Sequence, residues 1–127
     1  MTAATRALVR ERAGNHCEYC RIHQEDSPLA ALHIEHIRPL KHGGSDDESN
    51  LCLACIDCNL HKGPNLTGID PLTDAITPLF HPRQQRWDEH FRWDDLYIIG
   101  QTDVGRTTIR VLCMNSAEQL ELRMAGE

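Results

Sequence analysis

The stretch HIEHIRPLKHGGSDDESNLCLACIDCNLHKG, residues 33–63, holds most of the chemically informative positions of this chain. Three histidines and a carboxylate fall within its first ten positions, and an arginine and a lysine lie among them. A glycine pair follows, and three cysteines stand near the end of the stretch, the last two of them separated by two residues. Histidines beside an acid are compatible with a metal site, a proton-transfer site or an ordinary polar loop. The cysteines help to choose among these three.

The last two cysteines of this stretch, Cys55 and Cys58, repeat the spacing of an earlier pair, Cys17 and Cys20. Two intervening residues let both sulfurs of a pair turn to one ion, so two pairs predict a closed four-thiolate site for structural Zn²⁺. The pairs are 34 residues apart, more than the roughly 15–20 of compact zinc fingers. Because four thiolates leave no coordination position open, any catalyst must lie elsewhere. The alternative is four buried cysteines without metal.

The length of 127 residues predicts one domain, residues 1–127, with a modest core. Aromatic residues make up only 5% of the chain, and small domains with thin cores often use a metal as a staple. No apolar run approaches the roughly 20 residues of a membrane span, and residues 1–14 lack the apolar region of a signal peptide. We therefore expect a cytoplasmic protein without membrane contact, in which six cysteines favour metal or reactive thiols over disulfides.

The net charge of −6 would argue against a nucleic-acid partner if it were evenly distributed. It is not: residues 1–43 carry six basic and five acidic side chains, whereas residues 44–127 carry seven and fourteen. The acidity belongs mainly to the second part, so the global charge says little about what the histidine-rich stretch contacts.

The local patterns predict short elements rather than long ones. Apolar spacing and the stop at Gly14-Asn15 favour an N-terminal helix, and a polar, glycine-containing loop separates two apolar runs. Four prolines in residues 64–82 favour an extended wrapping segment. Ser116 and Gln119 resemble a capping box that opens a last helix. The predicted elements are helices at 3–13, 58–62, 104–115 and 117–124, strands within 29–37 and 50–54, and a strand pair within 86–103 that turns near Asp94-Asp95.

The whole pattern resembles the HNH endonuclease signature. The pair Glu35-His36 is followed after thirteen residues by Asn50, and then by a CxxCNxxKG ending that contains Asn59. The sharp motif covers residues 17–63, and NLTGIDPLT, LFHPRQQRWDEHFRW and VGRTTIRVL are also similar to bacterial HNH-signature proteins of this length. The resemblance implies an α+β fold with a small ββα-metal core, residues 14–64, stapled by the four-cysteine zinc site. A C-terminal β-hairpin and helices would form an extension, residues 65–127.

The resemblance also implies roles for individual residues. His36 would be the general base and Asn50 would hold the loop and the imidazole in position. Glu35 and Asn59 would bind a catalytic divalent cation, Mg²⁺ or Mn²⁺. Some HNH enzymes place a further histidine one helical turn later, where this chain has Gly63. Basic side chains near the motif are candidates for phosphate contacts, with solvated loop charges as the alternative: Arg38, Lys41, His42 and Lys62.

Elementary chemistry agrees with these roles. Phosphodiester hydrolysis needs an activated water and a cation on the developing charge, and neutral imidazole is a suitable base near pH 7. Oxygen ligands favour Mg²⁺ or Mn²⁺ over a soft ion. Neighbouring residues on a strand face opposite sides, so Glu35 and His36 need an irregular backbone, which Pro39 and the glycine pair make plausible.

The sequence therefore predicts a metal-dependent endonuclease whose partner is DNA. Two alternatives stay open: a non-catalytic zinc module that binds nucleic acid or protein, and an RNA nuclease on the same scaffold. Two further groups are expected to serve the core. These are the two remaining thiols, Cys52 and Cys113, and three aromatic residues for which base stacking is the alternative, Trp87, Phe91 and Trp93.

Overall fold

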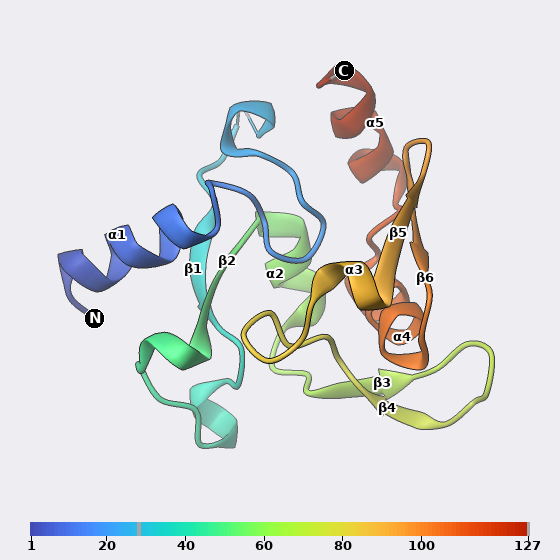
Figure 1. Cartoon of the computed structure of the whole chain (residues 1–127), viewed down its shortest axis with the longest axis horizontal. Helices are drawn as coiled ribbons and strands as arrows, with labels where there is room; N and C mark the ends of the chain where they lie inside the picture. The colour runs from blue at the N-terminus through green and yellow to red at the C-terminus, as the bar shows by residue number, and fades with distance from the viewer. Residues whose placement is uncertain (28, 127) are drawn as a thin grey trace.

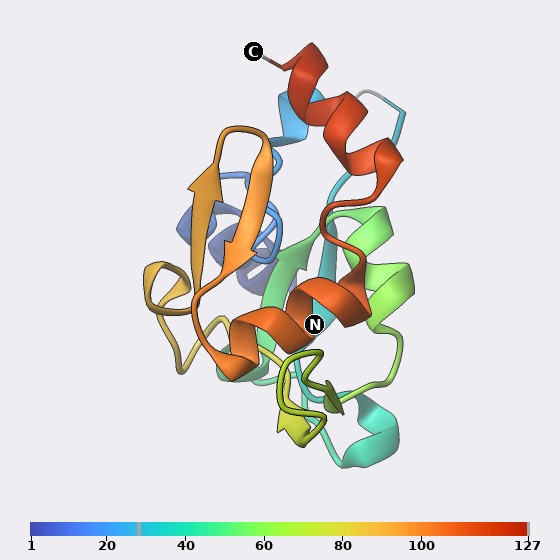
Figure 2. The same ribbon diagram turned by 90° about the vertical axis from the view of Figure 1, so that its right-hand side faces the viewer.

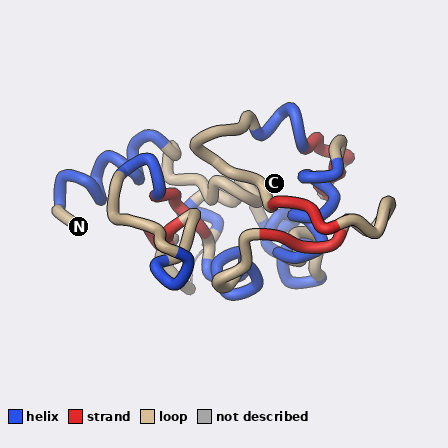
Figure 3. The backbone as a smooth tube through the Cα atoms, turned by 90° about the horizontal axis from the view of Figure 1, so that it is seen from below, coloured by secondary structure: helices blue, strands red, loops and turns tan. Residues whose placement is uncertain are grey.

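The computed structural model describes residues 1–27 and 29–126. It contains helices and three separate two-stranded antiparallel sheets (Figure 1 and Figure 3). In the first part of the chain the elements are α1 (Ala3–Arg12), η1 (Gln24–Asp26), β1 (His33–His36), η2 (Leu40–His42), η3 (Glu48–Asn50), β2 (Leu51–Ala54) and α2 (Ile56–Lys62). They are followed by β3 (Thr67–Ile69), β4 (Ile76–Pro78), α3 (Trp87–His90), β5 (Phe91–Asp94), β6 (Tyr97–Gly100), α4 (Asp103–Leu112) and α5 (Ala117–Ala125).

The central unit of the fold is the β1–β2 hairpin with α2 directly behind it. Glu35 pairs with Cys52 and His36 with Leu51 in the antiparallel register. All four residues of β2 are buried, as expected for a short apolar run that packs on both faces. Cys55 caps the N-terminus of α2, where its Sγ accepts from the Cys58 amide. The hairpin and the helix thus follow in the order that the sequence predicted.

α1 is attached to this unit by two arginines and one apolar side chain. The Arg10 guanidinium donates to the Leu32 carbonyl oxygen at 3.0 Å, directly before β1. The Arg12 guanidinium donates to the carbonyl oxygens of Glu48 (2.6 Å) and Leu51 (2.7 Å). Val9 is fully buried in the core. The helix therefore lies beside the β1–β2 hairpin, as Figure 1 shows.

The segment 64–82 differs from the prediction of an extended wrapping segment, because it forms the β3–β4 hairpin. Three-residue strands have too little periodicity to show in a sequence. The turn is closed instead by Asp70, whose carboxylate accepts from the Leu72 amide (3.0 Å) and the Thr73 hydroxyl (2.9 Å). The same carboxylate receives two hydrogen bonds from Arg106 on α4, at 2.9 and 3.0 Å.

The C-terminal part contains the predicted hairpin, β5–β6, and the two predicted helices. α4 contacts β6, α2 and the β3–β4 hairpin, so it joins the two halves of the molecule (Figure 2). Gly105 lets α4 approach the end of α3 closely, because a Cβ there would lie 2.0 Å from the His90 carbonyl oxygen. At α5 the Ser116 hydroxyl accepts from the Gln119 amide, as the capping pattern predicted.

Some of the residues expected in the core are buried, and others are exposed. Trp87 and Phe91 are buried, but 44% of Trp93 is exposed. Cys52 is buried, whereas Cys113 is exposed, so its prediction as a packed thiol is wrong. Cys113 follows α4 in a left-handed conformation (φ 51°), which turns it out of the helix that packs on the core. Within the described residues, no helix is long and apolar enough to cross a membrane.

Candidate functional site

A cavity of about 230 Å³ opens where β1 ends and α2 passes beside it. Glu35 and His36 contribute from the last two positions of β1, and Asn59 and Lys62 from α2. Gly63 lies at the C-terminal end of the same helix. The remaining lining residues are Tyr19, Pro39, Leu40 and Ala54.

The cavity brings together two neighbouring residues that a continuous strand would separate. Glu35 and His36 both line it although they are adjacent. β1 ends at His36, and the chain then turns through Pro39, which together with Leu40 forms the next part of the wall. The cavity therefore opens at a strand end, where strict alternation no longer applies.

The two predicted cation ligands are free of other partners. Among residues 1–27 and 29–126, no hydrogen bond engages the side-chain oxygens of Glu35 or Asn59. Burial raises the pKa of Glu35, while the charges of His33, His36 and Lys62 act against this shift. A half-buried carboxylate without a hydrogen-bond partner is costly, and a hard divalent cation bound by the two oxygens would offset that cost. The donor set therefore fits such an ion.

Asn50 joins the two ends of the loop that follows β1. Its Oδ1 accepts from the Arg38 amide (2.8 Å), and its Nδ2 donates to the carbonyl oxygens of Arg38 and Ser45 (both 2.9 Å). Its own carbonyl oxygen accepts from the Ile37 amide at 2.8 Å. Asn50 does not line the cavity, so its effect on His36 runs through the backbone.

His36 has one side-chain partner that the sequence did not reveal. Its Nε2 lies 2.7 Å from Oδ1 of Asp46, a residue of the loop between the glycine pair and η3. This contact holds the pKa of Asp46 below its usual value. The GGSDDESN stretch contains three acids, and nothing in their spacing indicates which one reaches the imidazole.

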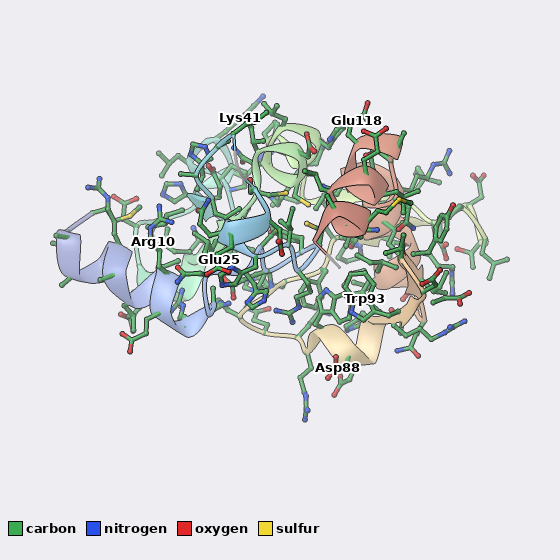
Figure 4. All side chains as sticks on the ribbon, turned by 90° about the horizontal axis from the view of Figure 1, so that it is seen from above. Arg10, Glu25, Lys41, Asp88, Trp93 and Glu118 are labelled. Carbon is green, nitrogen blue, oxygen red and sulfur yellow. The ribbon has the colours of Figure 1, made fainter. Side chains whose placement is uncertain are left out.

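The four basic candidates for phosphate contacts occupy different surroundings. Lys41 and His42 are exposed on η2, and Figure 4 shows Lys41 at the edge of the molecule. The Arg38 Nε donates to the His42 carbonyl oxygen at 2.5 Å. Lys62 is not a solvated loop charge: it lies on α2, is buried, and donates from Nζ to the Ile37 carbonyl oxygen at 3.0 Å. Of the four, only Lys62 lines the cavity.

The four cysteines Cys17, Cys20, Cys55 and Cys58 form one buried cluster, separate from the cavity. Their sulfur atoms lie within 4.8 Å of one another, and those of Cys20 and Cys55 are 3.6 Å apart. A tetrahedral ion with Zn–S bonds of about 2.3 Å places sulfurs about 3.8 Å apart, so the cluster fits such an ion. Hydrogen bonds within the cluster, that of Cys17 first, lower the pKa of Cys55 well below its usual value. The same hydrogen bonds raise the pKa of Cys20 and Cys58, so the four thiols differ in how readily they lose their protons.

The C-terminal helix contributes a contact to this cluster that the sequence did not predict. Gln119 on α5 is buried, and its Nε2 lies 3.7 Å from Sγ of Cys55. The amides of Cys20 and Cys58 also point at sulfurs, at 3.5 and 3.4 Å. Donors of this kind stabilise the negative charge of metal-bound thiolates. The contact joins residues 64 positions apart, a separation at which no local pattern is informative.

Gly63 and His61 bear on the further histidine that some HNH enzymes carry. Gly63 lines the cavity with φ 50° and ψ −139°, a backbone conformation that is strained for other residues. His61 is exposed and its Nδ1 lies 2.8 Å from the Asp57 carbonyl oxygen, outside the cavity lining. Neither position therefore offers a third side-chain ligand.

Residues 17–65 match the family model of the HNH endonucleases. The match contains both cysteine pairs and all the predicted site residues, from Glu35 to Lys62. This part of the chain is therefore similar to the domains of the HNH endonucleases. Searches of curated proteins and of solved structures gave no significant match.

Proposed function

We propose that the protein is a metal-dependent endonuclease that hydrolyses DNA phosphodiester bonds, with His36 as general base and a single divalent cation at Glu35 and Asn59. The observation that carries this proposal is the common cavity of Glu35, His36 and Asn59. A binding module has no need to gather an imidazole, a carboxylate and an amide oxygen around one space.

The proposed reaction uses the cavity as the place where the scissile phosphate sits. His36 takes a proton from a water molecule, whose oxygen bonds to phosphorus while the bond to the 3′ oxygen breaks. The products are a 5′ phosphate and a 3′ hydroxyl, as the HNH family resemblance implies. A bound Mg²⁺ or Mn²⁺ would stabilise the charge on the phosphate and the leaving oxygen.

Lys62 gives the cavity a fixed positive charge from this chain itself. One hydrogen bond to Ile37 holds its ammonium, and burial lowers its pKa. A desolvated cation acts more strongly on a phosphate than an exposed one does. We assign Lys62 to the scissile phosphate, and Arg38, Lys41 and His42 to the backbone further along the strand, where contacts position the substrate.

The remaining assignments concern the frame of the site. Asn50 positions the end of β1 through its three side-chain hydrogen bonds to Arg38 and Ser45. A structural Zn²⁺ in the cysteine cluster would fix the start of α2, because Cys55 and Cys58 flank its first turn. Together with β1 and β2 this helix would form the ββα-metal unit of the family.

Cleavage of supercoiled plasmid by the zinc-loaded protein in Mg²⁺ or Mn²⁺ tests the proposal. We expect nicking by the wild type and a loss of about 10²–10⁴-fold in His36→Ala, the usual contribution of a general base. His61→Ala is the matched control, since this histidine lies outside the cavity, and it should cleave like the wild type.

Three other results would change the conclusion. Equal nicking by His36→Ala would reject His36 as the base. If neither protein cleaves any DNA or RNA, the non-catalytic zinc module is the better account. Cleavage of RNA but not DNA under the same conditions would assign the site to an RNA nuclease.

A further inference from the structure

Asp46 is held against His36 by a loop whose backbone is fixed on both sides. Before it, the Ser45 carbonyl oxygen accepts from Asn50 at 2.9 Å. After it, the Asp47 carboxylate caps η3 by accepting from the Ser49 amide at 3.0 Å. Gly44 packs so closely that a Cβ would lie 1.7 Å from the Arg38 carbonyl oxygen. The carboxylate of Asp46 is therefore placed by the loop, although 59% of its side chain is exposed.

An acid at this place works against substrate binding. A nucleic-acid strand carries one negative charge per nucleotide, and each nearby carboxylate weakens its association. Asp46 contacts the ring of His36, and His36 lines the cavity where the phosphate is proposed to bind. Its position is therefore better explained by what it does to His36 than by contact with the substrate.

The chemistry of the contact decides which ring nitrogen carries the proton. An ionised carboxylate only accepts hydrogen bonds, so the His36 Nε2 at 2.7 Å must be the donor. In the neutral ring, Nδ1 is then left with a lone pair. We propose that Asp46 is a positioning residue that holds His36 as the Nε2-protonated tautomer, so that Nδ1 is the atom that receives the proton from water.

This inference rests on the proposed nuclease function and specifies one of its steps. The water proton moves to Nδ1, the water oxygen bonds to phosphorus, and the 3′ oxygen leaves and takes a proton from solvent. The ring becomes imidazolium, whose positive charge the Asp46 carboxylate stabilises while the proton on Nε2 stays in place. Asp46 itself touches neither the water nor the phosphate.

Steady-state kinetics of Asp46→Ala separate this role from a structural one. We expect kcat to fall about 10- to 100-fold, the same order as the loss of the hydrogen-bond partner of a metal-bound imidazole. KM should stay unchanged or fall, because a negative charge has been removed near a polyanion. Glu48→Ala is the matched control: it removes an exposed acid two residues further on, at the start of η3, and should leave kcat unchanged.

Asp46→Asn tests the tautomer, because an amide of the same shape can also donate and so permits the other protonation pattern. Its kcat should fall as well. Full activity of Asp46→Asn, or a rise in KM with unchanged kcat in Asp46→Ala, would overturn the proposal. Thermal melting of both variants should match the wild type, since the side chain is exposed.

Nitrogen NMR of the ring supplies a readout that does not depend on cleavage. In ¹⁵N-histidine-labelled protein at about pH 8, where a typical imidazole is neutral, the His36 signals should show protonated Nε2. They are identified by their absence in His36→Ala, and Asp46→Ala should convert them to a tautomer mixture. A wild-type ring protonated at Nδ1 would overturn the inference. Correct ring signals without any cleavage would instead reject the nuclease function.

Discussion

Among the described residues that line the cavity, two side chains carry a carboxylate or amide oxygen that could bind a hard cation. They are Glu35 and Asn59. Gly63 supplies none, and its backbone conformation disfavours a larger residue. A divalent ion bound there would keep several water molecules, which is the arrangement that Mg²⁺ prefers. Such a site should bind weakly until a phosphate completes the coordination.

Calorimetric titration of Mn²⁺ and Mg²⁺ into the zinc-loaded protein measures this affinity. We expect dissociation constants in the micromolar range or weaker. The binding free energy would then be no more favourable than about −8 kcal/mol. Glu35→Gln should abolish the heat of binding, whereas His61→Ala should leave it unchanged. A nanomolar site would contradict a set of two protein ligands.

The residues of the motif could be predicted from the sequence, and their partners could not. Glu35, His36, Asn50 and Asn59 have fixed spacings in the family signature, so the resemblance finds them. The contact of Asp46 with His36 depends on the path of a loop. The burial of the lysine on α2 depends on how that helix packs against β1. Tertiary contacts of this kind leave no local pattern.

At the scale of elements, the β3–β4 hairpin is tied to α4 by a buried carboxylate. Arg106 binds both oxygens of Asp70, and this contact is the main cause that lowers the pKa of Asp70 below its usual value. A carboxyl whose pKa is lower in the folded than in the unfolded state stabilises the fold above the unfolded value, about pH 3.9. That stabilisation is lost as the pH falls towards the folded value.

We therefore expect Asp70→Asn to melt at a lower temperature than the wild type near pH 7. The difference should shrink below about pH 4, where the wild-type carboxyl begins to lose its advantage. Circular dichroism melts at several pH values measure it. Asp74→Asn, an exposed acid in the same hairpin with φ 62°, is the control and should follow the wild type. A difference that stays constant from pH 7 to pH 3 would show that the ion pair is not the cause.

The β3–β4 hairpin also shows which elements could not be predicted from local sequence patterns. Helices α1, α2, α4 and α5 and the β5–β6 pair have enough apolar periodicity or capping residues to be predicted, as at Ser116. The one-turn helix α3 was missed, because Trp87–His90 lies in the stretch predicted as a strand pair and has no side-chain cap. β3 and β4 have three residues each, and their turn is defined by side-chain hydrogen bonds of Asp70. Their position depends on α4, far along the chain, as the Asp70–Arg106 spacing of 36 shows.

The cysteine cluster connects residues 17–58 with the C-terminal part of the chain. Gln119 of α5 contacts Cys55. Trp87 donates from Nε1 to the carbonyl oxygen of Tyr19 at 2.7 Å, and Tyr19 directly precedes Cys20 in the sequence. Arg83 forms an ion pair with Glu18 in the same loop. Loss of a metal here would therefore loosen the C-terminal part as well as residues 17–65. The division into a core, 14–64, and an extension, 65–127, stays a prediction.

Removal of the structural metal should thus unfold the protein as a unit. We expect one zinc per chain by elemental analysis and a strong fall in melting temperature with a tight chelator, as in small domains that fold only with zinc. Cys55→Ser should behave like the chelated wild type, and Cys113→Ser, at an exposed thiol, like the untreated one. A chelated protein that melts unchanged would show that the cluster has no structural metal.

The most direct measurement is a crystal structure of the zinc-loaded His36→Ala variant with a short DNA duplex and Mn²⁺, recorded with anomalous diffraction. The account predicts an anomalous peak between Glu35 and Asn59 that also touches one backbone phosphate. The space left by the missing ring at position 36 should hold a water molecule in line with the bond to the 3′ oxygen. A manganese peak elsewhere, or a duplex bound away from this cavity, would contradict it.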